Sequence, residues 1–248
     1  MKFKKLIKSL HKGKRTLFAV LIDPDKFNPL LIRMANEANV DCFLVGGSKL
    51  LRGNIDETVK KIKEISNLPV VLFPGDENQL SDKADGLFLP SLLSGRNPDY
   101  LISKQVLMAP NIYRMKLKHA PMAYILLNGD KQSSTQKVTK TQPLALNNKQ
   151  QLLDTALAAK YLGFELLYLE AGSGAKKSIP PILIKEVKEK IHLPLIVGGG
   201  INTAKKVKDY IQAGANMIVV GNALEKDINL LKSLSACFEQ PLKTPKHI

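Results

Sequence analysis

The sequence has little cysteine, no tryptophan and no long apolar run. Cys42 and Cys237 are the only cysteines, and their wide separation argues against both a disulfide framework and a zinc site. We therefore expect a reducing, cytoplasmic setting. No apolar stretch is long enough to span a bilayer or to act as a signal peptide, which predicts a protein that is soluble or peripheral at the inner membrane face.

Several catalytic motifs are also missing. The four histidines, His11, His119, His192 and His247, lie away from the predicted strand ends, which argues against histidine acid catalysis and a His-rich metal site. No serine triad or P-loop occurs. The run Gly198–Gly200 does not continue into the Gly-x-Gly-x-x-Gly fingerprint of dinucleotide binding. The sequence therefore gives no support for a histidine-based, serine-triad, P-loop or dinucleotide-binding site.

Positive charge is the one component in clear excess. The 37 Lys and Arg residues outnumber the 22 Asp and Glu residues, which gives a net charge of +15. Such a field favours encounters with nucleic acid, with an anionic membrane or with phosphorylated substrates. A basic, solvated surface with no dedicated partner explains the charge equally well.

Eight short apolar runs recur along the chain, each followed by an amphipathic or loop segment. This alternation predicts an α/β protein whose parallel strands are buried on both faces. The chain length of 248 residues suits one (βα)₈ TIM barrel, so we predict a single domain over residues 1–248. The expected strands are 16–23, 41–47, 69–75, 85–93, 122–128, 165–172, 193–200 and 216–223.

Helical periodicity appears between most of these strands. The predicted helices are 55–65, 149–162, 181–191, 203–213 and 224–234. Asn202 or Thr203 would cap the helix at 203–213, and Gly214 would end it. The polar segment 129–143 is expected to be a long loop over the barrel mouth. The N-terminal segment is basic, and residues 239–248 are expected to form a short basic tail.

Glycine-rich strand ends predict a phosphate site. Gly198–Gly200 end one expected strand, and Gly221, Asn222 and Ala223 end the next, just before a helix. In barrels of this kind the loops after the last two strands commonly hold a phosphate. Glycine lets backbone N–H groups approach the anion, and a helix N-terminus adds favourable charge. Tight turns alone would also explain these glycines.

Carboxylates and hydroxyls follow three other strands. Strand alternation should direct Tyr168 and Glu170 to the same side, where Glu170 could orient a substrate hydroxyl or act as a base. A salt bridge at the barrel rim is the other interpretation of Glu170. Asp23 and Ser48 end the first two strands and could share Mg²⁺, although Asp23 could equally be a helix cap. Ser173 adds a further anion-binding turn.

Taken in order, the motifs LIDPD, LVGGS, LFPG, YLEAGSGA, IVGGGI and VVGNAL resemble those of the geranylgeranylglyceryl phosphate synthase family, which includes heptaprenylglyceryl phosphate synthases. The likeness runs from Leu21 to about Glu225, and YLEAGSGA is its most specific part. It implies a Mg²⁺-dependent prenyltransferase that joins a polyprenyl diphosphate, with geranylgeranyl diphosphate as our first expectation, to the 3-hydroxyl of sn-glycerol 1-phosphate. An ether lipid precursor and pyrophosphate would result.

The resemblance also implies roles for individual residues. Mg²⁺ would lie on Asp23 and Ser48, with Glu170 and Tyr168 as catalytic residues. Glycerol phosphate would bind Tyr168, Leu169, Glu170, Ala171, Gly172, Ser173, Gly174, Gly199, Gly200, Gly221 and Asn222. Apolar side chains of a prenyl groove are expected among Phe88, Leu92, Tyr100 and Tyr124. We further expect a homo-oligomer with peripheral contact to an anionic membrane.

Two other functions fit parts of the sequence. A phosphosugar isomerase or synthase of amino-acid or cofactor biosynthesis would use the same phosphate-binding strand ends, since fold does not determine function. A nucleic-acid-binding protein would use the positive charge and would show steep salt dependence. The sequence contains no recognised nucleic-acid motif, and this function would leave the glycine-rich strand ends unexplained, so we expect no nucleic-acid partner.

Overall fold

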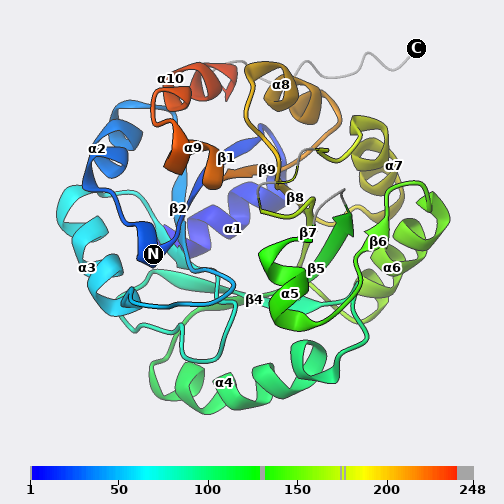
Figure 1. The fold of residues 1–248 in the computed structure, drawn as a ribbon, viewed down its shortest axis with the longest axis horizontal. Helices are drawn as coiled ribbons and strands as arrows, with labels where there is room; N and C mark the ends of the chain where they lie inside the picture. Colours follow the sequence, from blue (N-terminus) through cyan, green and yellow to red (C-terminus); the bar gives the residue numbers. More distant parts are fainter. Residues whose placement is uncertain (1, 129–131, 174, 176, 239–248) are drawn as a thin grey trace.

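The strands of the computed structural model surround one central axis (Figure 1). The structure describes residues 2–128, 132–173, 175 and 177–238. The barrel strands are β1 (Leu17–Ile22), β2 (Cys42–Val45), β3 (Val70–Leu72), β4 (Gly86–Leu92), β5 (His119–Asn128), β7 (Leu166–Glu170), β8 (Leu195–Gly198) and β9 (Met217–Val220). All neighbouring strands are parallel, and the pairing of β4 with β5 closes the ring. The predicted TIM barrel is confirmed, and all eight expected strands are present.

Helices cover the outside of this barrel (Figure 1). They are α2 (Pro29–Glu37), α3 (Ile55–Ile65), α4 (Lys104–Arg114), α6 (Lys149–Tyr161), α7 (Pro181–Ile191), α8 (Ala204–Gln212), α9 (Asn222–Lys226) and α10 (Leu230–Ser235). Shorter turns occur at η1 (Pro24–Lys26), η2 (Asp99–Ser103) and η3 (Ala236–Phe238). Thr203 caps α8 through the N–H of Lys206, and Gly214 follows that helix with a φ of +91°, as predicted.

Two apolar cores follow from strand alternation. On β7, Leu166 and Tyr168 belong to the core inside the barrel, whereas Leu167 and Leu169 belong to the core between the strands and the helices. The outer core is the larger of the two. Because both strand faces are buried, each strand reads in the sequence as a nearly continuous apolar run.

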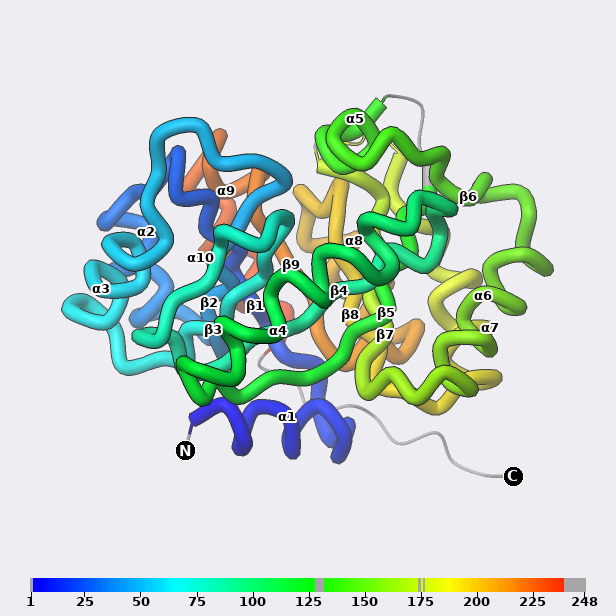
Figure 2. The backbone as a smooth tube through the Cα atoms, turned by 90° about the horizontal axis from the view of Figure 1, so that it is seen from below, coloured from blue at the N-terminus to red at the C-terminus, as the bar shows by residue number. Residues whose placement is uncertain are grey.

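The end of the barrel formed by the strand N-termini is closed by α1 (Lys2–Lys12), the basic N-terminal segment (Figure 2). Phe3, Leu6 and Leu10 on one face of α1 are buried in the inner core. The ring of Phe3 occupies the space that a side chain at Gly86 would need. The Leu10 carbonyl accepts a hydrogen bond from Asn216 Nδ2 at 3.2 Å. The other end of the barrel is therefore left for a site.

Two sequence-based expectations are corrected. The expected loop 129–143 contains a helix, α5 (Ser134–Thr139), because the Ser133 hydroxyl accepts the N–H of Gln136 and caps its first turn. The short strand β6 (Leu144–Ala145) follows and pairs with the end of β5. The expected helix 224–234 is divided into α9 and α10. There the Asp227 side chain accepts the N–H of Asn229 and stabilises a turn instead of a continuous helix.

Candidate active site

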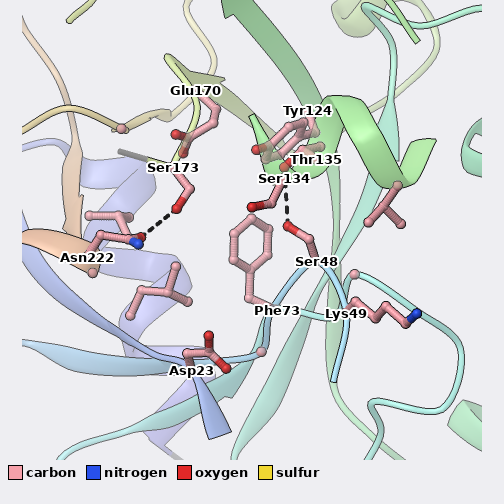
Figure 3. Close-up of a pocket in the computed structure, with 18 of the residues that line it drawn as sticks. Asp23, Ser48, Lys49, Phe73, Tyr124, Ser134, Thr135, Glu170, Ser173 and Asn222 are labelled. Atoms are coloured by element: carbon pink, nitrogen blue, oxygen red, sulfur yellow. Dashed lines mark hydrogen bonds between the residues drawn. The ribbon is translucent and has the colours of Figure 1, made fainter. Parts of the chain in front are cut away.

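A cavity of about 680 Å³ lies at the C-terminal end of the barrel strands, and residues of α5 help to line it. Residues from the ends of β1, β2, β3, β7, β8 and β9 line it. The predicted residues Asp23, Ser48, Tyr168, Glu170 and Ser173 are all among them. The tertiary structure thus brings together side chains that are up to 150 positions apart in the chain. Figure 3 shows most of these side chains around one opening.

Tyr168 lies in a stack of three aromatic rings inside the barrel. Its ring centroid is 5.2 Å from that of Phe73 and 5.2 Å from that of Tyr124. Tyr168 is almost fully buried, and burial raises the pKa of its hydroxyl well above the ordinary value. Tyr168 is therefore a neutral hydrogen-bond donor held rigidly at the bottom of the cavity.

Glu170 is a buried carboxylate next to Tyr168. Burial raises the pKa of Glu170 to about 7, although hydrogen bonds from the Gly172 N–H and the Tyr168 hydroxyl act in the opposite direction. The Gly172 N–H lies 2.8 Å from Glu170 Oε1. The hydrogen bond between the Tyr168 hydroxyl and Glu170 confirms the expectation that both side chains lie on one side of their strand. A carboxyl group with such a pKa can exchange a proton near neutral pH.

Glycines make room for these two side chains. A Cβ at Gly198 would lie 2.1 Å from the Tyr168 hydroxyl, and a Cβ at Gly199 would lie 2.2 Å from Glu170 Oε1, so both would clash. Gly199 and Gly200 also have φ values of +83° and +67°, which disfavour other residues. The glycine run at the end of β8 is therefore required by both packing and backbone conformation.

The ends of β7 and β9 meet beside this glycine run. Ser173 Oγ donates a hydrogen bond to Asn222 Oδ1 at 2.6 Å, which joins the turn after β7 to the first residue of α9 (Figure 3). Gly221 caps the same helix, and all three residues line the cavity. Gly199, Gly200, Gly221, Asn222 and Ser173 thus form a contiguous group with hydroxyl, amide and backbone donors, which suits an anion.

The remaining predicted glycerol phosphate residues are placed differently. Leu169 and Ala171 are buried in the outer core, so their side chains point away from the cavity. Gly172 packs against Ser133, at the start of α5. Gly174 lies outside the described residues. For Leu169, Ala171 and Gly172 the structure leaves only backbone groups as candidate ligands.

The predicted metal ligands Asp23 and Ser48 both line the cavity. Asp23 Oδ1 accepts the N–H of Asp25 at 3.0 Å, and its Oδ2 lies 3.5 Å from Lys26 Nζ. Asp23 thus also caps a turn, as the other interpretation proposed. Within the described part of the chain no group of three His, Cys, Asp or Glu side chains gathers to hold a metal. The carboxylate and hydroxyl oxygens of Asp23 and Ser48 are nevertheless donors that fit Mg²⁺ if substrate oxygens complete the shell.

An apolar wall continues the cavity toward α4. Leu92, Tyr100 and Tyr124 line it, whereas Phe88 lies deeper, with its ring centroid 6.2 Å from that of Phe3, and is not one of the lining residues. Tyr100 donates a hydrogen bond to the carbonyl of Val138 in α5 at 3.3 Å. Three of the four residues predicted for a prenyl groove therefore border the cavity.

Sequence patterns did not single out several residues of this site. Phe73 directly follows β3 in the motif LFPG, but only the packed barrel brings its ring onto Tyr168. Thr135 of α5 lies 3.4 Å from Ser48, oxygen to oxygen, and also contacts the Tyr124 hydroxyl. Lys26 connects Asp23 to Glu225. The sequence did offer one signal for Lys26, because Lys26 follows the predicted metal ligand Asp23 by three residues in the segment DPDK.

The sequence of this chain is similar to one family model and to several synthases of the same name. The model of the PcrB family matches residues 10–238. The chain is 44% identical to geranylgeranylglyceryl phosphate synthase of Zunongwangia profunda, over 86% of this chain and 93% of that protein. It is 40% identical to the synthase of the same name from Pyrococcus furiosus, with coverages of 91% and 92%.

A solved structure is similar over nearly the whole chain. The (S)-3-O-geranylgeranylglyceryl phosphate synthase of Thermoplasma acidophilum, in complex with its substrate sn-glycerol-1-phosphate, superimposes with a TM-score of 0.85 at 34% identity. The match covers 94% of this chain and 96% of that one. The similarity extends from the sequence motifs to the arrangement of the barrel.

Proposed function

The chain belongs to the PcrB family, and from that premise we propose that it is a prenyltransferase of the geranylgeranylglyceryl phosphate synthase type. It joins the prenyl group of a polyprenyl diphosphate, with geranylgeranyl diphosphate as the first candidate, to the 3-hydroxyl of sn-glycerol 1-phosphate and releases pyrophosphate. The observation that carries the proposal is the buried Tyr168–Glu170 pair, which lines the cavity. The chain that holds this pair is 34% identical to a synthase whose structure was solved with sn-glycerol-1-phosphate.

Glycerol phosphate is proposed to lie across the ends of β7, β8 and β9. The phosphate faces the backbone N–H groups of Gly199, Gly200 and Gly221, with Ser173 and Asn222 beside them. These residues gather on one side of the cavity, and the positive φ of both Gly199 and Gly200 orients the local backbone. The glycerol hydroxyls then face Tyr168 and Glu170 at the bottom.

The proposed reaction forms one bond and breaks another. The 3-hydroxyl oxygen bonds to C1 of the prenyl group, while the bond between C1 and the diphosphate oxygen breaks and its electron pair leaves with pyrophosphate. Glu170 accepts the hydroxyl proton, for which a pKa of about 7 is well suited. Tyr168 remains neutral and orients the acceptor through hydrogen bonding. The Phe73–Tyr168–Tyr124 stack restricts Tyr168 to that position.

Mg²⁺ is proposed as the cofactor, held by Asp23 and Ser48. When bound, the ion supplies neutralisation of the diphosphate charge. The hard oxygen donors of these two residues, both on the cavity wall, support this assignment. Asp23 is oriented by the Asp25 N–H, and Ser48 by Thr135.

The prenyl chain is proposed to lie along Leu92, Tyr100 and Tyr124, with Phe88 beneath them. Leu92, Tyr100 and Tyr124 give the cavity an apolar wall that begins near Tyr168 and extends toward α4. An apolar wall suits a polyprenyl tail because burial of its methylene groups is favourable.

We further propose a cytoplasmic homo-oligomer that contacts an anionic membrane to collect its lipid-like substrate. The net charge of +15 supports the attraction to anionic lipid. Within the part of the chain that the structure describes, no helix is both long and apolar enough to cross a membrane. The contact would then be peripheral.

An assay of purified protein tests this function. Radiolabelled sn-glycerol 1-phosphate, Mg²⁺ and a series of polyprenyl diphosphates are incubated with the enzyme, with sn-glycerol 3-phosphate as the matched control. An organic-soluble product that requires the 1-phosphate and disappears with a chelator is expected. If no donor yields a product, the phosphosugar alternative is favoured instead.

A further inference from the structure

Five lysines are among the described residues that line the cavity, and Lys26 differs from the other four. Lys104 Nζ lies 2.9 Å from Asp76 and 2.6 Å from Glu77, which are not among the residues predicted to hold the metal or the phosphate. The side chain of Lys49 points away from Asp23 (Figure 3). Lys137 and Lys226 are exposed, as are Lys26 and Lys49. Among these five lysines, Lys26 is the one whose ammonium lies beside the predicted metal ligand Asp23.

Local backbone structure holds Lys26 in place. It ends the turn η1, directly after β1, and its N–H donates to the carbonyl of Asp23 at 2.9 Å. Asp23 Oδ1 is occupied by the Asp25 N–H, so Oδ2 is the oxygen that faces Lys26 Nζ, at 3.5 Å. The second partner, Glu225 Oε2 on α9, is closer, at 2.9 Å. Lys26 therefore connects the metal side of the cavity to the phosphate side.

The local charge shows why this lysine matters. Asp23 and Glu225 with Lys26 carry a net charge of minus one, counting two carboxylates and one ammonium. The nearby Asp25 is satisfied separately, because its carboxylate accepts the N–H groups of Leu51, Arg52 and Gly53. Without Lys26 the group would carry minus two and would repel a diphosphate more strongly. A divalent cation at Asp23 would, in contrast, be favoured by the loss of a neighbouring ammonium.

We propose that Lys26 is a catalytic residue that binds the leaving group. This inference rests on the proposed function. The Lys26 ammonium, held by Glu225, donates hydrogen bonds to the diphosphate oxygens and keeps its own protons. It stabilises the electron pair that remains on pyrophosphate when the bond to prenyl C1 breaks, while the glycerol hydroxyl proton goes to Glu170. Because Lys26 also faces Asp23, it opposes the binding of a divalent cation alone.

Lys26 is proposed to favour binding of the diphosphate and to oppose binding of a divalent cation alone, so one substitution should change these two affinities in opposite directions. In Lys26→Met, calorimetry should show that inorganic pyrophosphate in the presence of Mg²⁺ binds about tenfold more weakly. Electron paramagnetic resonance should show that Mn²⁺ alone binds a few-fold more tightly, because a cation near Asp23 has been removed. Lys226→Met, a neighbouring lysine on the same cavity, is the matched control and should leave both affinities within about twofold.

Two further variants separate charge from packing. Lys26→Arg should restore most of the pyrophosphate affinity. Glu225→Gln removes the closer partner, so Lys26 should move onto Asp23 and Mn²⁺ alone should bind more weakly than to the wild type. A purely structural role for Lys26 would weaken both ligands together in Lys26→Met and would not distinguish Arg from Met.

Either of two results would overturn the proposal. One is unchanged pyrophosphate affinity in Lys26→Met, and the other is a parallel loss of pyrophosphate and Mn²⁺ binding. Both readouts are independent of turnover. Failure of the prenyltransferase assay with intact pyrophosphate binding would therefore refute the proposed reaction, whereas a wild-type protein that does not bind pyrophosphate with Mg²⁺ would refute both.

Discussion

The Tyr168 hydroxyl lies only 2.1 Å from the position that a Cβ at Gly198 would take. Both residues lie at the inner surface of the barrel, where Tyr168 on β7 pairs with Ile196 on β8, two residues before Gly198. A second close approach, to Glu170 Oε2 at 2.8 Å, involves the same Cβ position. The absence of a side chain at residue 198 is therefore a condition for the Tyr168–Glu170 pair.

Gly198→Ala should displace Tyr168 and lower kcat/KM by at least about tenfold, because the acceptor would lose its orientation. Circular dichroism should show an intact fold, and calorimetry should show weaker binding of sn-glycerol 1-phosphate. Gly163→Ala is the control. Gly163 has a φ of +81° but no neighbour within 4 Å, so this change should cost about 1 kcal/mol of stability and leave activity unchanged. Normal activity of Gly198→Ala would show that Tyr168 can move without consequence.

Glu170 makes stability depend on pH. Burial raises the pKa of Glu170 from the ordinary value of 4.5 to about 7, so between these values the folded protein holds a proton that the unfolded chain has released. The free energy of unfolding must then fall as pH rises through this window, by about 3 kcal/mol at most. In Glu170→Gln this fall is absent.

Urea unfolding of both proteins at pH 4.5 and pH 8 measures this effect. The stability of Glu170→Gln relative to the wild type should increase between the two pH values. An equal difference at both would mean that Glu170 is not destabilised by burial.

Activity should depend on the same ionisation in the opposite sense. If Glu170 is the base, kcat/KM should rise with pH through about 7 as the carboxyl loses its proton. Glu170→Ala should lose roughly two orders of magnitude in turnover. Tyr168→Phe removes a hydrogen bond that lowers the Glu170 pKa, so the rising limb should move to higher pH. The substrate titrates identically in the assays of the wild type and of Tyr168→Phe. If the rising limb of the pH profile does not move in Tyr168→Phe, then Tyr168 does not affect the ionisation of Glu170.

The contact between Phe3 and Gly86 predicts that α1 is part of the barrel core. Phe3→Ala should cost about 3–5 kcal/mol, since Phe3 is 3% exposed and its removal leaves a space inside the barrel. Lys4→Ala, on the exposed face of the same helix, should change stability by less than about 0.5 kcal/mol. Chemical denaturation measures both, and a small effect of Phe3→Ala would mean that the barrel is stable without α1.

The strands were predictable because parallel strands buried on both faces require continuous apolar runs. Seven of the eight expected runs contain an observed strand, and the eighth, 122–128, lies within β5. The predicted helices 55–65 and 181–191 match α3 and α7 at both ends. Helix α5 was not predictable in the same way. Its six residues, STQKVT, carry no apolar period, and its start depends on the Ser133 cap. Likewise, Asp227 ends α9 through a local hydrogen bond that periodicity does not reveal.

The sequence by itself determined which residues end the strands, and therefore which of them could reach a common site. Asp23, Ser48, Glu170, Gly199 and Asn222 were identified in this way, since parallel strands in a barrel share one C-terminal face. Only the tertiary structure decided how these groups affect one another. The stacking of Phe73 on Tyr168 depends on a distance across the barrel, the raised pKa of Glu170 on its burial there, and the contact of Lys26 with Glu225 on the pairing of β1 with β9. Closure of the ring sets these relationships, and no local pattern encodes them.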